Sequence, residues 1–292
     1  MSAAARDGAE QDWMVVAAEW SDKTWRVAQR AAWLARQGTL RASLVHVHQY
    51  GLQHALRGMG LEACAQYQRE RLARLAQAIE RQTGVLFDVE VHGALRGGAA
   101  ALRKRYGQAC LSVVGAHQAW GVRHPTRALA QDSGHPVLMV KREAAPAYRR
   151  ALVLVDASAP STTPVAQARR LAPEAEIVLL SVLGRKGEHR LRYAGAAEDV
   201  IRAHLQQERE DALNGLARLC GADGAGAAGL ARIVEHGYCP TVLQYAERRI
   251  RPDLLVLPGD RGGGLRRWFL RSLVGEALAR SDCDILVLPQ GA

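Results

Sequence analysis

The chain has 292 residues, of which 48% are hydrophobic, and a formal net charge of +10 at pH 7. This length suggests two domains of ordinary size, and the composition is sufficient to bury two cores. No apolar run approaches the ~20 residues of a membrane-spanning helix, and the N-terminus lacks the apolar core of a signal peptide, so we expect a soluble, cytoplasmic protein. The five cysteines are odd in number and form no Cys-x-x-Cys pair, which argues against a disulfide framework or a zinc site.

The positive charge comes almost entirely from arginine, with 39 Lys and Arg against 29 Asp and Glu. Such an excess favours association with polyanions such as nucleic acids, nucleotides or acidic lipids. The alternative is compositional, because a chain rich in Arg, Ala, Leu and Gly is typical of a GC-rich genome. No helix-turn-helix pattern or basic-aromatic RNA-binding motif supports the first reading, so nucleic-acid binding stays an alternative.

Strands and helices alternate along the first half. Apolar runs predict strands at 13–18, 42–48, 85–91, 111–114 and 136–141, and helical spacing predicts helices at 24–37, 61–82 and 97–106. Residues 50–60 are predicted to be irregular. A short linker at 143–147 follows.

The same order then begins again. Strands are predicted at 151–155, 176–183, 230–235, 254–257 and 285–288, and helices at 164–171, 196–220 and 240–249, with a further helix between the last two strands. The Gly-rich run 221–229 is predicted to be a loop.

Matching segments recur in the two halves at a spacing of roughly 145 residues. The segment 89–93 corresponds to 233–237, 111–115 to 254–258, and 135–140 to 283–288. Alternating strands and helices with right-handed crossovers give a doubly wound parallel sheet. We therefore predict an α/β protein with two tandem open five-stranded parallel sheets, in a first domain at 1–146 and a second at 147–292.

The last part of the chain, residues 253–288, has the order strand, Gly-rich loop, helix and strand, which brings a helix N-terminus to the edge of a sheet. Together with Gly115-Ala116-His117-Gln118, the run 135–141 and the run 283–287, this stretch resembles the universal stress protein family, most closely its E-type tandem members. The resemblance implies that the last strands of the two domains pair antiparallel as an internal pseudo-dimer, which hides two sheet edges.

In nucleotide-binding members of this family the loop reads Gly-x2-Gly-x9-Gly-Ser/Thr. Aligned without gaps from Cys283, this chain has Pro258, Arg261 and Arg271 at the three glycine positions, and Ser272 at the hydroxyl position. A frame shifted by one residue restores Gly259 and Gly262 but puts Ser272 at the third glycine. Glycines alone also suit a tight turn that lets a helix approach a strand.

The resemblance implies that the second domain's candidate nucleotide site lies at the carboxyl ends of its strands. Asp156 would face adenine and Val182 would hold the base through its backbone; Ser158 lies beside them. The candidate residues are Asp156, Ser158, Val182, Gly259, Arg261, Gly262, Gly263, Gly264, Arg271 and Ser272. Arg261, Arg266, Arg267 or Arg271 could contact phosphate by charge. Alternatively, the side chain of Arg271 blocks the close approach that glycine permits.

Other candidate sites have simpler interpretations. Asp156 and Ser158 suit a helix-capping turn better than a catalytic pair. His46 and His48 share a strand face, but without a third ligand they are interpreted as ordinary strand-end histidines rather than metal ligands. In the first domain Glu19 replaces the family Asp, and the span 115–135 is shorter than 258–283, so we expect no nucleotide there. A different pocket lined by His117 and Trp120 is the alternative.

The resulting functional expectation is a non-enzymatic stress-response binding or signalling module. No metal or tightly bound cofactor is expected, although ATP remains possible in the second domain. The alternatives are weak ATP binding or an ATPase switch through the second domain, polyanion binding through surface arginines, and an apolar ligand between the long helices and the sheet. We expect the protein to associate with itself and with unknown proteins, and not with a membrane.

Overall fold

A computed structural model describes residues 13–20, 23–38, 40–48, 61–93, 109–116, 134–157, 161–222, 230–259 and 265–289, without the side chains of 47–48, 61, 220–222 and 265–272. In the first half the described elements are β1 (Trp13–Ala17), α1 (Thr24–Gln37), β2 (Arg41–His48), α3 (Leu61–Thr83), β3 (Phe87–Gly93), β4 (Leu111–Gly115) and β5 (Val137–Val140). The predicted helix at 97–106 lies outside the described residues.

The second half contains β6 (Arg150–Leu154), α6 (Thr163–Leu171), β7 (Glu176–Leu183), α7 (Lys186–Tyr193), α8 (Glu198–Ala222), β8 (Ala231–His236), α9 (Cys239–Ile250), β9 (Leu254–Leu257), α10 (Leu265–Arg280) and β10 (Asp284–Val287). Strand boundaries agree with the sequence within one or two residues. The short helix α7 is additional, because its polar sequence has no apolar periodicity and none of its residues is buried.

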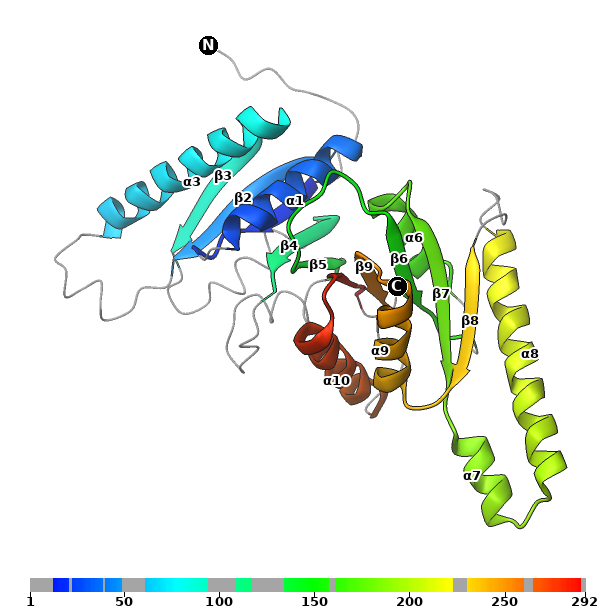
Figure 1. The fold of residues 1–292 in the computed structure, drawn as a ribbon. Coiled ribbons are helices and arrows are strands. Elements are labelled where there is room, and N and C mark those ends of the chain that lie inside the picture. Colours follow the sequence, from blue (N-terminus) through cyan, green and yellow to red (C-terminus); the bar gives the residue numbers. More distant parts are fainter. Residues whose placement is uncertain are drawn as a thin grey trace.

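The strands form one ten-stranded sheet in the order β3-β2-β1-β4-β5-β10-β9-β6-β7-β8 (Figure 1). Within each half all strand pairs are parallel, and the order 3-2-1-4-5 occurs twice. Strands β5 and β10 pair antiparallel, with Leu138 opposite Leu286. The predicted tandem α/β fold and the predicted antiparallel pairing of the two last strands are therefore confirmed.

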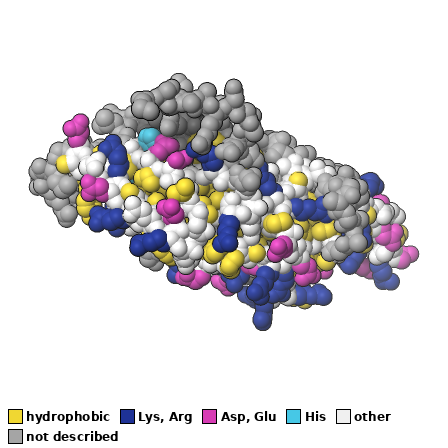
Figure 2. Space-filling view, turned by 90° about the horizontal axis from the view of Figure 1, so that it is seen from above, with side chains coloured by type: hydrophobic (Ala, Val, Ile, Leu, Met, Phe, Trp, Pro, Cys, Tyr) yellow, Lys and Arg dark blue, Asp and Glu magenta, His cyan; other side chains and the backbone are white. Residues whose placement is uncertain are grey.

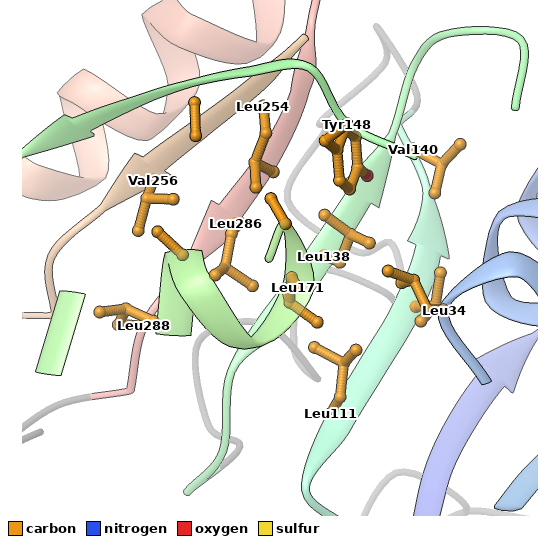
Figure 3. Close-up of a cluster of buried hydrophobic side chains, with 14 of the residues drawn as sticks. Leu34, Leu111, Leu138, Val140, Tyr148, Leu171, Leu254, Val256, Leu286 and Leu288 are labelled. Atoms are coloured by element: carbon orange, nitrogen blue, oxygen red, sulfur yellow. The ribbon is translucent and has the colours of Figure 1, made fainter. Parts of the chain in front are cut away.

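Helices cover both faces of the sheet. One apolar cluster contains buried residues of α1, α3, α6 and α8, whereas the other contains buried residues of α9 and α10. The first cluster is continuous across the join between the halves: it contains Leu34 and Leu138 of the first half and Leu171 and Leu286 of the second (Figure 3). Because apolar burial stabilises roughly in proportion to the area removed from water, the halves share one core on this face.

No helix among the described residues is long and apolar enough to span a membrane.

Candidate functional site

In each half the strand order reverses once, between β1 and β4 and between β6 and β9. In open parallel sheets, ligands bind outside the carboxyl ends of the strands at such a switch point. The sequence candidates of the second half follow the strands that surround this point. Asp156 follows β6, Val182 lies at the end of β7, and Gly259 follows β9.

Asp156 and Val182 lie close to each other at the carboxyl edge. Leu154 of β6 is in register with Leu180 of β7, and the two candidates are each two residues further along. The side chain of Asp156 is exposed, whereas that of Val182 is partly buried. Between these positions the Ala157 N–H donates to the buried hydroxyl of Ser181 at 3.3 Å. The structure thus brings the two proposed base-contacting residues to one edge.

Asp156 does not cap the following helix. Helix α6 begins at Thr163 after Thr162 as its N-cap; the Thr162 side chain makes no capping hydrogen bond, and the Thr163 N–H donates to Ser161 Oγ at 3.3 Å. The predicted capping role of Asp156 is therefore wrong, because five residues separate it from that N-cap. Ser158 lies outside the described residues.

Gly259 is in a close backbone contact. A Cβ atom at this position would lie 1.7 Å from the carbonyl oxygen of Pro289 and 3.0 Å from that of Leu288. The Leu288 N–H donates to Leu257 O at 3.1 Å, which holds the two segments together. The absence of a side chain at Gly259 is thus explained by packing between the ends of β9 and β10, without reference to a phosphate.

The helix that follows the Gly-rich loop begins at Leu265, so Arg271 and Ser272 are its seventh and eighth residues. Only the first four N–H groups of a helix lack partners within it. The backbone N–H groups of Arg271 and Ser272 are therefore inside the helix and not among those that bind anions at its N-terminus. Arg261, Gly262, Gly263 and Gly264 lie outside the described residues, as do the side chains of Arg271 and Ser272.

In the first half, the protein's own side chains occupy the corresponding edge. Trp20, at φ 52°, donates from Nε1 to His46 Nε2 at 2.9 Å, and His46 Nδ1 lies 2.7 Å from Ala18 O. The guanidinium of Arg71 lies 4.1 Å from the centre of the Trp20 ring. Across the switch point, Lys23 Nζ donates to Ala116 O at 2.7 Å.

These contacts fix the tautomer of His46. Its Nε2 accepts from Trp20, so Nδ1 carries the proton and donates to Ala18 O. Both ring nitrogens are thus engaged within the fold, which agrees with an ordinary strand-end histidine. The side chain of His48 and the whole of residues 117 and 120 lie outside the described part of the structure. Sequence reasoning missed Trp20; its signal was an aromatic residue directly after Glu19 at the end of the first strand.

A second group of polar side chains, which the sequence analysis did not identify, lies between α8 and the end of β8. Glu208 Oε1 is 3.4 Å from His204 Nε2, and Glu208 Oε2 is 3.4 Å from His236 Nε2. His204 also packs on α7, where a Cβ at Gly187 would lie 2.5 Å from its Nε2. The i, i+4 spacing of His204 and Glu208 was the available signal. Within the described ranges, no group of three or more His, Cys, Asp and Glu side chains is arranged to hold a metal ion.

A shallow depression between α9 and α10 is lined by Glu247, whose carboxylate is partly buried. Ser281 Oγ donates to it at 2.6 Å, and Cys283 Sγ lies 3.8 Å away. Burial raises the pKa of Glu247, and burial also raises the pKa of the Cys283 thiol far above its ordinary value. A thiol in this state is not a nucleophile, so Cys283 has a packing role.

Comparison with known proteins agrees with this architecture. Residues 147–289 match the model of the universal stress protein family. A universal stress protein from Archaeoglobus fulgidus DSM 4304 has a similar fold, with a TM-score of 0.67 and 15% identity over 96% of this chain and 97% of that one. A functionally unknown protein from Pseudomonas aeruginosa PAO1 has a TM-score of 0.61 and 14% identity over 96% and 93%.

No curated protein sequence matches the chain. At these identities the solved structures establish the fold alone, while the family model establishes the membership of the second half. The chain thus carries a universal stress protein domain at 147–289 and shares its fold, over nearly its whole length, with a universal stress protein from Archaeoglobus fulgidus.

Proposed function

We propose that the protein is a non-enzymatic stress-response module that acts by binding or signalling, and that neither half binds ATP tightly. The carrying observation is the occupied edge of the first half, where Trp20, His46 and Lys23 contact one another or the strand ends. In the second half, the position of Arg271 inside α10 supports the same conclusion. A ligand would have to displace internal contacts in one half and bind in the other with Arg271 inside α10.

The one serine–histidine pair that we find among the described side chains is buried, which supports a non-enzymatic role. Ser112 Oγ lies 2.7 Å from His135 Nε2, but the two residues are only 1% and 7% exposed. They also lie at the amino ends of β4 and β5, away from the switch point. Burial lowers the pKa of His135 and favours its neutral form. Without access to substrate, the pair is better explained as a packing contact.

Thermal unfolding with and without ATP and magnesium tests this proposal. A ligand at a hundredfold excess over its Kd adds about 2.7 kcal/mol of stability. We expect no shift, or a weak shift that is lost in Arg261→Ala. The matched control is Asp282→Ala, which removes an exposed carboxylate elsewhere in the same half. A large shift that Asp156→Ala abolishes and Asp282→Ala preserves would contradict the proposal.

A second candidate function is a weak ATP-dependent switch in the second half. It is favoured by the exposed carboxylate of Asp156 beside the end of β7, where the family pattern places an adenine contact. Its signature is steady phosphate release that follows the protein through purification and falls in Asp156→Asn and Ser272→Ala. Release that is unchanged in both variants would eliminate this candidate.

Polyanion binding is the third candidate, because the chain carries a formal charge of +10. On the face seen in Figure 2, however, Lys and Arg side chains are interspersed with acidic and apolar ones. Binding to a DNA duplex that weakens steeply between 50 and 200 mM salt would support this role.

Native mass spectrometry of the purified protein would report self-association and any retained apolar molecule in the same measurement.

A further inference from the structure

The join between the halves has an approximate twofold axis through the pair Leu138–Leu286. Val137 lies opposite Val287, and Met139 lies opposite Ile285. This symmetry makes Asp284 the counterpart of Pro136, and Pro289 the counterpart of Lys141. The polar residues at the join therefore have no symmetric copies.

Asp284 accepts four hydrogen bonds at the join although it is 0% exposed. Its Oδ1 accepts the backbone N–H groups of Lys141 at 2.8 Å and Arg142 at 3.0 Å. Its Oδ2 accepts Arg30 Nε at 3.1 Å and the Tyr148 hydroxyl at 2.8 Å. Three of these four donors belong to the first half, whereas Asp284 and Tyr148 belong to the second. We call these five residues the Asp284 network.

Arg30 is equally buried, at 3% exposed, and has a second set of contacts. Its guanidinium stacks 4.2 Å from the centre of the Tyr148 ring and donates to Ala145 O at 2.8 Å. The corresponding helix of the second half, α6, provides no equivalent, because its buried residues are Pro164, Val165, Ala168 and Leu171.

Lys141 adds a further one-sided contact. Its Nζ donates to Leu278 O at 2.7 Å and to Ser281 O, at the C-terminus of α10. A cation at this end of a helix is favoured by the helix dipole. The counterpart, Pro289, has neither an ammonium group nor a backbone N–H.

We infer that the edges of β5 and β10 are complementary to each other and not to copies of themselves, so that the halves form only a mixed pair. If two β10 edges paired, each Asp284 would lose the three donors of the first half and face a proline at the position of Lys141. If two β5 edges paired, each Arg30 would be buried opposite Pro136, without a carboxylate. Burying an unpaired charge is strongly unfavourable, which excludes both same-kind arrangements. This partner selection is independent of any ligand at the strand ends.

The test uses the full chain with a protease site inserted between Glu143 and Ala144, so that both fragments stay present after cleavage. Unlabelled and ¹⁵N-labelled cleaved chains are mixed in urea just below the unfolding transition, and the complexes are weighed by native mass spectrometry. We expect every complex to contain one N-terminal and one C-terminal fragment. Same-kind pairs in the 1:2:1 proportion of random association would overturn the inference.

A substitution distinguishes selective pairing of unlike halves from general stabilisation of the join. In Asp284→Leu the β10 edge becomes apolar, and we expect the ratio of same-kind to mixed complexes to rise at least tenfold. Asp282→Leu, two residues away and exposed, should leave the ratio unchanged. If Asp284→Leu does not fold, Arg30→Met replaces it, and the N-terminal fragment should then lose its preference for mixed pairs. Unchanged ratios in the folded variant would contradict the inference.

Discussion

Arg30→Met is the substitution whose effect the structure predicts most directly. It leaves the carboxylate of Asp284 at 0% exposure without its guanidinium partner 3.1 Å away, and it removes the hydrogen bond to Ala145 O. Methionine keeps an unbranched apolar side chain, so the loss is mainly electrostatic. Removing one member of a buried ion pair costs about 3–5 kcal/mol. At roughly 2 °C per kcal/mol for a chain of this size, the midpoint of thermal unfolding should fall by about 6–10 °C.

The control is Arg26→Met, one turn earlier on the same helix. Arg26 pairs with Glu143 at 2.6 Å, but the two side chains are 36% and 74% exposed. An exposed ion pair contributes about 0–1 kcal/mol, so this variant should unfold close to the unmodified protein. Urea unfolding followed by circular dichroism gives both free energies. If the two variants differ by less than about 1 kcal/mol, the reasoning about the buried pair is refuted.

Three further substitutions test other parts of the structure. Gly259→Ala should destabilise the protein by about 1–3 kcal/mol because the added Cβ would meet Pro289 O. The control is Gly275→Ala, in α10 with open space around it, which should stabilise the protein by up to about 1 kcal/mol. Equal urea midpoints for the two variants would contradict the packing role of Gly259. Trp20→Phe keeps an aromatic ring but loses the donor to His46, and should cost about 1 kcal/mol in the same assay; no loss would show that this bond contributes nothing. Burial raises the pKa of Glu247, so the folded state binds the proton of this carboxyl more tightly than the unfolded state does. The stability that Glu247 contributes is therefore fully present below its pKa in the unfolded state. It is lost as the pH rises through its pKa in the folded state. Glu247→Gln should therefore gain stability relative to the unmodified protein at pH 7 but not at pH 4, and a pH-independent difference would contradict this.

The sequence predicted the fold well because its strands are short, mainly apolar runs in a fixed alternation with helices. Strands β7 (Glu176–Leu183) and β9 (Leu254–Leu257) were predicted at their observed boundaries, and the family resemblance implied the antiparallel pairing of the two last strands. Helix α7 was missed because no apolar face marks it: it is held at one side of α8 through the contact of Gly187 with His204.

The candidate site was less predictable, because its properties depend on contacts between distant segments. The sequence placed Asp156 and Val182 at one edge, but it could not show that the backbone of Gly259 touches Pro289. Likewise, the indole of Trp20 reaches His46 from a residue 26 positions away. A carboxylate inside the apolar run 283–288 was the one visible sign of the Asp284 network, since a buried charge requires partners.

The antiparallel pairing of β5 and β10 also determines the directions in which the two halves face. All strands within a half run the same way, so at the join the carboxyl ends of the first half point away from those of the second. The two crevices consequently open on opposite rims of the sheet, and no single small molecule can touch both. Any communication between them must cross the join, where Leu138 meets Leu286 and Arg30 meets Asp284.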